Sequence, residues 1–323
     1  MSSILNIQNL VVRFKLTKKV QIHAVNDVSV SLKEKETVGI VGESGCGKSV
    51  TFLSILGLIP KPPGIIESGR AIFNGKDLFK ISSEEIRRIR GSEIGFVFQD
   101  PMTSLNPVLS IGNQLSESVM LHRGFNRKDA DEHSVNLLKQ VGIPEPAKRL
   151  KEFPHQFSGG MRQRVMFAMA ISCNPRILIA DEPTTALDVT VQAQLIDLVK
   201  ELRNNIGMAV VWITHDLGVI SGLVDVVNVM FAGSIVEKAP VKKIFSDPQH
   251  PYTQGLIGSL PHKSTKNIKR LTNIPGTPPD GLILSKGCSF APRCSLAIDR
   301  CHSEIPLLKE LDKDHHVACW LRV

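Results

Sequence analysis

The segment GESGCGKS, residues 42–49, is the feature that most constrains this chain of 323 residues. It fits the pattern G-x-x-x-x-G-K-[ST], in which glycines allow backbone N–H groups to wrap around a phosphate. An apolar run, TVGIVG (37–42), precedes it, and a second apolar segment, KSVTFLSILGLI (48–59), follows it. The N-terminus of a helix at this place would also attract negative charge. The sequence therefore predicts a phosphate-binding loop between a strand and a helix of an α/β fold.

Two side chains of this phosphate loop (residues 42–49) have expected roles. Lys48 would reach the β- and γ-phosphates of a nucleotide, and the Ser49 hydroxyl would ligate Mg²⁺. Cys46 occupies a variable position of the pattern, so its thiol has no expected role.

Three further apolar runs end abruptly in polar residues: IGFVFQD (94–100), ILIADEP (177–183) and AVVWITHD (209–216). Such runs predict strands buried on both faces, as in a mostly parallel sheet, with functional residues at their C-terminal ends. The second of these runs carries the pair Asp181–Glu182. One carboxylate could hold the metal shell through water, and the other could accept a proton from an attacking water.

The interval of residues 110–175 is rich in predicted helix, including an amphipathic surface helix at 126–143 and a packed helix at 161–173. Past residue 250 prolines recur, cysteines gather and no strand-like run is recognised. We therefore interpret the end of the chain as an appended extension outside the α/β core.

The amino-acid composition indicates a soluble globular protein but does not identify its binding partner. The apolar fraction of 42% and charged fraction of 22% are those of a soluble globular protein. The net charge of +8 indicates an anionic partner without choosing among nucleotide, nucleic acid and membrane surface, while 5% aromatics argue against base stacking. No apolar run reaches the roughly 20 residues of a membrane-spanning helix, and the polar start argues against a signal peptide. We therefore expect a cytosolic chain.

The segment HQFSGGMRQR (155–164) resembles the Leu-Ser-Gly-Gly-Gln signature of ATP-binding cassette (ABC) ATPases, with Phe157 in place of Leu and Met161 in place of Gln. Gln99 resembles the family's Q-loop glutamine, and Asp188 in TTALD (184–188) its D-loop aspartate. His215 resembles the switch histidine, which contacts the γ-phosphate. Phe14 is similar to the aromatic residue that stacks on adenine, although a phenylalanine after a strand is as often simple packing. The resemblance assigns catalysis to Glu182, His215 and Gln99, Mg²⁺ to Ser49, Gln99 and Asp181, and ATP contacts to Phe14, Gly42, Glu43, Ser44, Gly45, Cys46, Gly47, Lys48, Ser49 and Val50.

This resemblance implies Mg²⁺-dependent ATP hydrolysis by a P-loop core with a mostly parallel sheet, a small antiparallel β subdomain and an α-helical subdomain at about residues 100–175. It also implies a sandwich dimer with a second ATPase subunit, either a copy or a homologue. The residues expected to contact the ATP bound by that second subunit are Ser158, Gly159, Gly160 and Asp188.

Three segments resemble the dipeptide/oligopeptide permease ATPases, close relatives of which import nickel: residues 99–115, 250–261 and 274–294. The implied assembly has two membrane permease subunits and an external substrate-binding protein, with this chain peripheral at the cytoplasmic face of the membrane and no nucleic acid bound. The implied domains are a nucleotide-binding domain at 1–255 and a C-terminal extension at 256–323. A non-transport ABC ATPase acting on nucleic acid or ribosomes is the alternative class, and a redox-regulated ATPase could coexist with transport.

Four of the six cysteines lie in the C-terminal extension, spaced C-x5-C-x6-C-x17-C. They could hold a [4Fe–4S] cluster or zinc, form two disulfides, or be small buried hydrophobic residues. The cytosol disfavours disulfides, and the spacing lacks the close pairs of structural zinc sites, so we favour the cluster with zinc as the alternative. His315 and His316 could substitute as ligands, but we expect them to be solvated. We also expect this metal-clipped extension to be separate from the catalytic machinery; its cysteines are Cys288, Cys294, Cys301 and Cys319.

Overall fold

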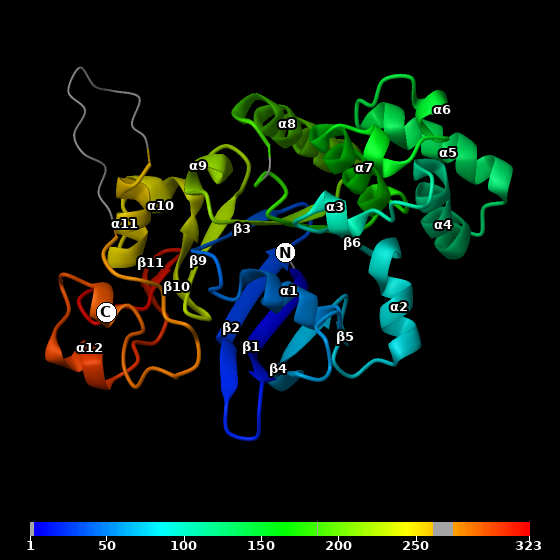
Figure 1. Ribbon diagram of the computed structural model, residues 1–323. Helices are drawn as coiled ribbons and strands as arrows, with labels where there is room; N and C mark the ends of the chain where they lie inside the picture. Colours follow the sequence, from blue (N-terminus) through cyan, green and yellow to red (C-terminus); the bar gives the residue numbers. More distant parts are fainter. Residues whose placement is uncertain (1–2, 186, 261–273) are drawn as a thin grey trace, which may run out of the picture. The chain divides into compact units, whose positions relative to one another are not determined.

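The computed structural model describes residues 3–185, 187–260 and 274–323 (Figure 1). Ala186 of the TTALD motif and residues 261–273 of the predicted extension therefore lie outside the described residues. The chain divides into two compact units, one formed mainly by Ile81–Ile213 and the other by three segments, Ser3–Leu32, Thr37–Lys80 and Thr214–Val323. Within the described ranges, no helix combines the length and apolar character needed to cross a bilayer.

The Ile81–Ile213 unit contains three parallel strands in the order β8-β7-β6. Every residue of β7 (Ile177–Asp181) and β8 (Ala209–Thr214) is buried, and β6 spans Ile94–Val97. The predicted strands buried on both faces are therefore confirmed. Each is two or three residues shorter than the run suggested, because the last residues of the run lie beyond the end of the strand.

The same unit carries the predicted helices, three of which pack on one another in the green part of Figure 1. These are α4 (Ile111–Arg123), α5 (Arg127–Gln140) and α7 (Gly159–Ile171). The Asn126 side chain caps α5, and the buried residues of α5 recur at helical spacing, which confirms the amphipathic pattern. The remaining helices of the unit are α2 (Ser83–Ser92), α3 (Pro101–Ser104), α6 (Pro146–Arg149), the 3-10 turn η1 (Pro154–Gln156) and α8 (Val189–Ile206).

The second unit contains a sheet in the order β2-β1-β4-β5, in which β1 pairs antiparallel with β4, and β4 with β5. This sheet confirms the small antiparallel β subdomain. Its strands are β1 (Ser3–Lys15), β2 (Gln21–Lys33), β4 (Gly64–Phe73) and β5 (Lys76–Asp77).

The strands of the second unit that lead to the phosphate loop have the order β11-β12-β10-β9-β3. The fully buried β3 (Thr37–Val41) runs parallel to β9 (Val226–Phe231), and β10 (Ser234–Pro240) runs antiparallel to β9. The helices of this unit are α1 (Lys48–Ile55), α9 (Leu217–Ile220), α10 (Val241–Ser246), α11 (Pro251–Gly258), the 3-10 turn η2 (Ala291–Arg293) and α12 (Asp299–Ser303).

The expectation that strands end before residue 250 is wrong. The C-terminal extension forms a hairpin of β11 (Lys309–Asp312) and β12 (His315–Val317), and β12 pairs with β10. The extension therefore joins the sheet and does not lie outside the α/β core. Sequence reasoning missed these strands because β11 is mostly charged and exposed along its whole length, and both strands are very short, so neither shows an apolar alternation.

A buried glutamate fastens this hairpin. Glu237 of β10 is fully buried, and its carboxylate accepts the backbone N–H groups of Gln249 and His250, each at 2.8 Å. Its Oε1 also lies 2.7 Å from Nε2 of His315, a residue that is 2% exposed. The expectation that His315 is solvated is therefore wrong. It arose because the neighbouring residues in the sequence are polar, and the sequence does not show that the His315 side chain faces a buried carboxylate.

We expect Glu237→Ala to lower the free energy of unfolding by about 3 kcal/mol, because each buried donor left without an acceptor costs about 1–3 kcal/mol. The matched control is Glu310→Ala on the exposed strand β11, which we expect to change stability by less than about 0.5 kcal/mol. Urea denaturation followed by circular dichroism measures both values. Equal losses in the two variants would contradict the anchoring role of Glu237.

Candidate nucleotide site and cysteine pocket

The phosphate loop connects the last residue of β3, Val41, to the first residue of α1, Lys48. Gly45 and Gly47 have φ angles of 79° and 98°, in the left-handed region that favours glycine. They differ in their surroundings, because a Cβ at Gly47 would collide with the carbonyl oxygen of Ala24, whereas a Cβ at Gly45 would have nothing within 4 Å. The loop backbone thus approaches its neighbours too closely at Gly47 to accept a side chain.

Lys48 is held close to this loop. It is 4% exposed, and its Nζ donates to the carbonyl oxygens of Gly42 and Glu43 at 2.8 and 3.0 Å. Ser49 follows it in the first turn of α1, and Ser44 is exposed beside the loop's opening turn. Burial raises the pKa of the Cys46 thiol, which keeps that side chain protonated and chemically quiet.

In the Ile81–Ile213 unit, Asp181 ends β7 and Glu182 follows it, and both are buried. Glu182 has φ 44°, an uncommon conformation for a residue with a side chain, and its N–H donates to Ile213 O at 2.9 Å. Its Oε2 accepts from Gln99 Nε2 at 3.1 Å and from Thr185 Oγ1 at 3.2 Å. The structure therefore brings Glu182 and Gln99 together, two of the three residues predicted for catalysis.

His215, the third of these residues, directly follows the last residue of β8 in the chain, but it belongs to the other unit and is exposed. Phe14 lies near the end of β1, opposite Gly64 of β4, and its ring would be 3.2 Å from a Cβ placed at Gly64. The half-buried Phe14 ring thus packs over Gly64, which has no side chain. Its stacking on adenine stays a prediction.

The residues predicted to face a second subunit begin two helices. Ser158 caps α7, where its Oγ accepts the Met161 N–H at 3.3 Å, and Asp188 caps α8, where its Oδ1 accepts the Thr190 and Val191 N–H groups. Ser158, Gly159 and Asp188 are exposed, and Gly160 is half-buried. An exposed helix N-terminus can accept a phosphate from outside the chain.

Sequence reasoning missed two residues that hold the phosphate loop. The Glu43 N–H donates to the Tyr252 hydroxyl at 2.9 Å, and Arg293 donates to both oxygens of the Glu43 carboxylate, at 2.7 and 2.9 Å. The expectation that the C-terminal extension is separate from the catalytic machinery is therefore wrong. No periodicity marks an ion pair between a buried arginine and a half-buried glutamate that lie so far apart in the chain.

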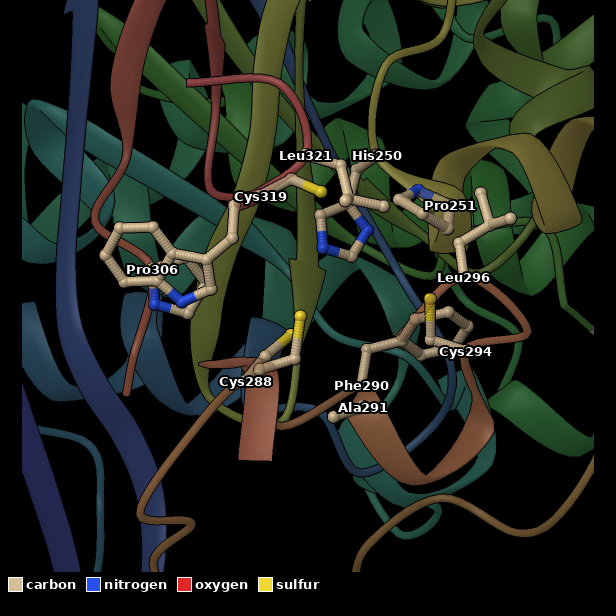
Figure 2. Close-up of a pocket in the computed structure, with 12 residues that line it drawn as sticks. His250, Pro251, Cys288, Phe290, Ala291, Cys294, Leu296, Pro306, Cys319 and Leu321 are labelled. Carbon is tan, nitrogen blue, oxygen red and sulfur yellow. The ribbon is translucent and has the colours of Figure 1, made fainter. Parts of the chain in front are cut away.

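The four cysteines of the extension line one pocket of about 310 Å³, a volume that includes space open to solvent (Figure 2). Backbone contacts join its segments, since the Cys288 N–H donates to Cys301 O at 2.7 Å. None of the six cysteines, all of which are described, forms a disulfide. Burial raises the pKa of the thiols of Cys288, Cys294 and Cys319. The other residues lining this cysteine pocket are His250, Pro251, Phe290, Ala291, Leu296, Pro306, Trp320 and Leu321.

Within the described ranges, no three His, Cys, Asp or Glu side chains are already arranged around a single metal ion. The metal ligands that the pocket could offer are nevertheless all of one kind, because the four cysteine thiols are the only acidic groups among its mostly apolar lining residues. His250 is engaged elsewhere, since its Nδ1 accepts the Tyr252 N–H at 3.1 Å. Burial lowers the pKa of His250 to about 4, which keeps the ring neutral. The pocket thus offers sulfur ligands in apolar surroundings.

Comparison with known proteins agrees with this geometry. The family model for ABC transporters matches residues 25–185, and the model for the oligopeptide/dipeptide transporter C-terminal region matches residues 236–301. A solved dimeric structure of an ATP-binding cassette, in a post-hydrolysis state bound to ADP and Pi, aligns with a TM-score of 0.66 and 28% identity over 73% of this chain and 98% of that chain. The fold and site thus define an ATP-binding cassette with the P-loop α/β core.

Two curated relatives from Bacillus subtilis narrow the family. The dipeptide transport ATP-binding protein DppD is 49% identical over 322 residues, which cover 100% of this chain and 96% of the relative. The oligopeptide transport ATP-binding protein OppD is 48% identical over 318 residues, which cover 98% of this chain and 88% of the relative. The chain belongs to the ABC transporter family of ATPases, in the branch that carries the oligopeptide/dipeptide transporter C-terminal region.

We expect Gly47→Ala to weaken ATP binding by at least about tenfold more than Gly45→Ala. Both substitutions force a side chain into a left-handed conformation, which costs about 1–3 kcal/mol, but only the first also meets a backbone carbonyl. Titration with a fluorescent ATP analogue measures the two dissociation constants. The same affinity in both variants would contradict the close packing of the loop against Ala24.

Proposed function

We propose that this chain is the Mg²⁺-dependent ATP-hydrolysing subunit of an importer that carries dipeptides or oligopeptides across the cytoplasmic membrane. The observation that carries this proposal is the phosphate loop, together with the Glu182–Gln99 pair, in a chain that is nearly half identical throughout to peptide-transport ATPases. ATP hydrolysis itself follows from membership of the family.

The phosphate loop and its lysine bind the nucleotide in this proposal. The N–H groups of the loop and the N-terminus of α1 face the phosphates, and the Lys48 ammonium balances the charge of the β- and γ-phosphates. Ser49, Gln99 and Asp181 would hold Mg²⁺, which supplies further charge neutralisation on the phosphate oxygens. Phe14 stacks on the adenine.

Glu182 is the general base. Its carboxylate accepts the proton of the attacking water, and the hydrogen bonds from Gln99 and Thr185 fix the direction in which that carboxylate points. The backbone at φ 44° supports this assignment, because strained residues cluster at active sites. His215 contacts the γ-phosphate.

The active form is a dimer of two ATPase subunits. Ser158, Gly159, Gly160 and Asp188 contact the ATP bound by the second subunit, which is a copy or a homologue of this chain. The exposure of Ser158, Gly159 and Asp188 supports this role, as does the dimer found for the related cassette. Two permease subunits and an external substrate-binding protein complete the importer, and this chain is peripheral at the cytoplasmic face of the membrane.

The cysteine pocket holds a [4Fe–4S] cluster in this proposal. Iron–sulfur clusters are bound by cysteine thiolates, and here four thiols from one apolar pocket supply that ligand set. Since burial raises the pKa of three of these thiols, binding releases protons and is coupled to the folding of the extension. The cluster would act as a structural clip.

We expect proteoliposomes that contain this chain, its partner ATPase, the permease subunits and the substrate-binding protein to take up labelled peptide with ATP. Glu182→Gln should retain ATP binding and lose at least about 100-fold in both hydrolysis and uptake, because the general base is gone. Isothermal titration, phosphate release and uptake of label measure the three quantities.

The control is Lys48→Ala, which should lose ATP binding itself. Near-normal turnover in Glu182→Gln would refute its role as the base, and unchanged ATP affinity in Lys48→Ala would refute the phosphate-binding role of the loop. Uptake of nickel but not of peptide would refute the peptide substrate.

For the cysteine pocket, we expect brown protein with about four iron and four sulfide per chain when it is purified without oxygen. Cys294→Ser should lose most of this iron, whereas Cys173→Ser, which changes a free thiol outside the pocket, should keep it. Metal and sulfide analysis and the visible absorption spectrum give the readout. Colourless wild-type protein with stoichiometric zinc would overturn the cluster in favour of zinc.

A further inference from the structure

Arg293 is almost fully enclosed between the extension and the phosphate loop. It is 8% exposed, and its Nε donates to Pro275 O at 2.8 Å while both terminal nitrogens donate to the Glu43 carboxylate. The hydrogen bonds that Arg293 donates to Glu43 are the main reason why the pKa of Arg293 is raised. Fork-to-fork pairing of this kind fixes direction as well as distance, because two parallel bonds allow only one relative orientation.

Two aromatic rings also lie close to the guanidinium of Arg293. It lies 5.7 Å from the ring centre of Phe231, at the end of β9, and 5.9 Å from that of Phe290 in the extension. Tyr252 of α11 packs against both rings, at 4.7 and 5.4 Å between centres. The charged group therefore has little freedom to leave Glu43.

Glu43 in turn is held at three points. Its carboxylate is bound by Arg293, its N–H donates to the fully buried Tyr252 hydroxyl, and its carbonyl oxygen accepts from Lys48 Nζ. The last contact involves the lysine that we assign to the phosphates. The position of the Glu43 backbone thus sets both the start of the loop and one of the groups that orient Lys48.

We infer that Arg293, together with Tyr252, is a positioning residue for nucleotide binding: it holds the Glu43 backbone so that the phosphate loop is in its binding conformation before ATP arrives. This inference rests on the proposed phosphate-binding role of residues 42–49. Arg293 does not touch the reacting atoms and acts only through Glu43.

If Arg293 positions the loop, its loss should raise the KM for ATP and leave kcat largely unchanged. When the fraction of molecules with a competent loop falls, the apparent dissociation constant for ATP rises by the same factor. Saturating ATP draws the loop back into the competent conformation, so kcat is largely kept. If the ion pair only fastened the extension to the core, its loss would lower stability and leave the KM for ATP unchanged.

The test compares Arg293→Met, Glu43→Gln and the double variant with the wild type, in the complete transporter complex. Methionine keeps much of the length of the arginine side chain but has no guanidinium, so the Glu43 carboxylate loses the two N–H donors of Arg293. We expect the KM for ATP to rise roughly tenfold in each single variant, with kcat within about twofold, because a hydrogen bond to a charged group contributes about that factor. The double variant should be no worse than the poorer single variant, since both changes break one interaction.

The matched control is Arg300→Met, which removes another arginine–glutamate pair of the extension, the exposed pair of Arg300 and Glu304. It should leave the KM for ATP unchanged. Iron content and thermal stability, measured on every variant, show whether the cysteine pocket and the fold survive. If Arg293→Met does not fold, Glu43→Gln carries the test, because it breaks the same pair and leaves the extension intact.

An unchanged KM in both single variants, or an equal rise in Arg300→Met, would overturn the inference. Independent, multiplying effects in the double variant would overturn it as well. Lys48→Ala separates this failure from failure of the proposed function. If that variant loses ATP binding while Arg293→Met binds normally, only the inference fails, and if Lys48→Ala binds ATP normally, the phosphate-loop assignment fails first.

Discussion

The close approach of the phosphate loop to its neighbours is the constraint on which the rest of the site depends. A loop that presents N–H groups to phosphate must expose its own backbone, and such a loop has few side chains with which to hold itself in place. Contacts from outside must therefore fix it. Gly47 packs against the Ala24 carbonyl, and Glu43 is bound by Tyr252 and Arg293.

The residues that hold the phosphate loop come from distant parts of the sequence. Tyr252 comes from α11 and Arg293 from the extension, so the end of the chain helps to shape a loop near its beginning. The turn that carries Arg293, η2, also contributes Ala291 to the wall of the cysteine pocket, and the residues that flank this turn, Phe290 and Cys294, line the same pocket. One turn of chain thus takes part in both the pocket and the contact with Glu43.

The core could be predicted because its signals are local. A run such as 177–183 is apolar because β7 is buried on both faces, and the phosphate loop is recognisable because its glycines and lysine are adjacent. The Glu182–Gln99 hydrogen bond was not predicted as a contact, yet both residues were, since each follows a strand. The hairpin of β11 and β12 gave no such signal, because its pairing with β10 depends on a buried partner and not on its own sequence pattern.

Two of the errors about the extension, the solvated His315 and the separation from the catalytic machinery, have one physical origin, which is the burial of charged residues together with their partners. Sequence patterns assign charged residues to solvent, but Glu237 and Arg293 are buried because each finds its partners inside the fold. Burying such groups is costly, and a buried ion pair adds little net stability compared with apolar packing. Removing one partner of such a pair is nevertheless strongly destabilising, because the remaining charge is then buried without a partner or water to stabilise it. These contacts therefore contribute specificity, because displacing the extension would separate His315 from Glu237 and Arg293 from Glu43.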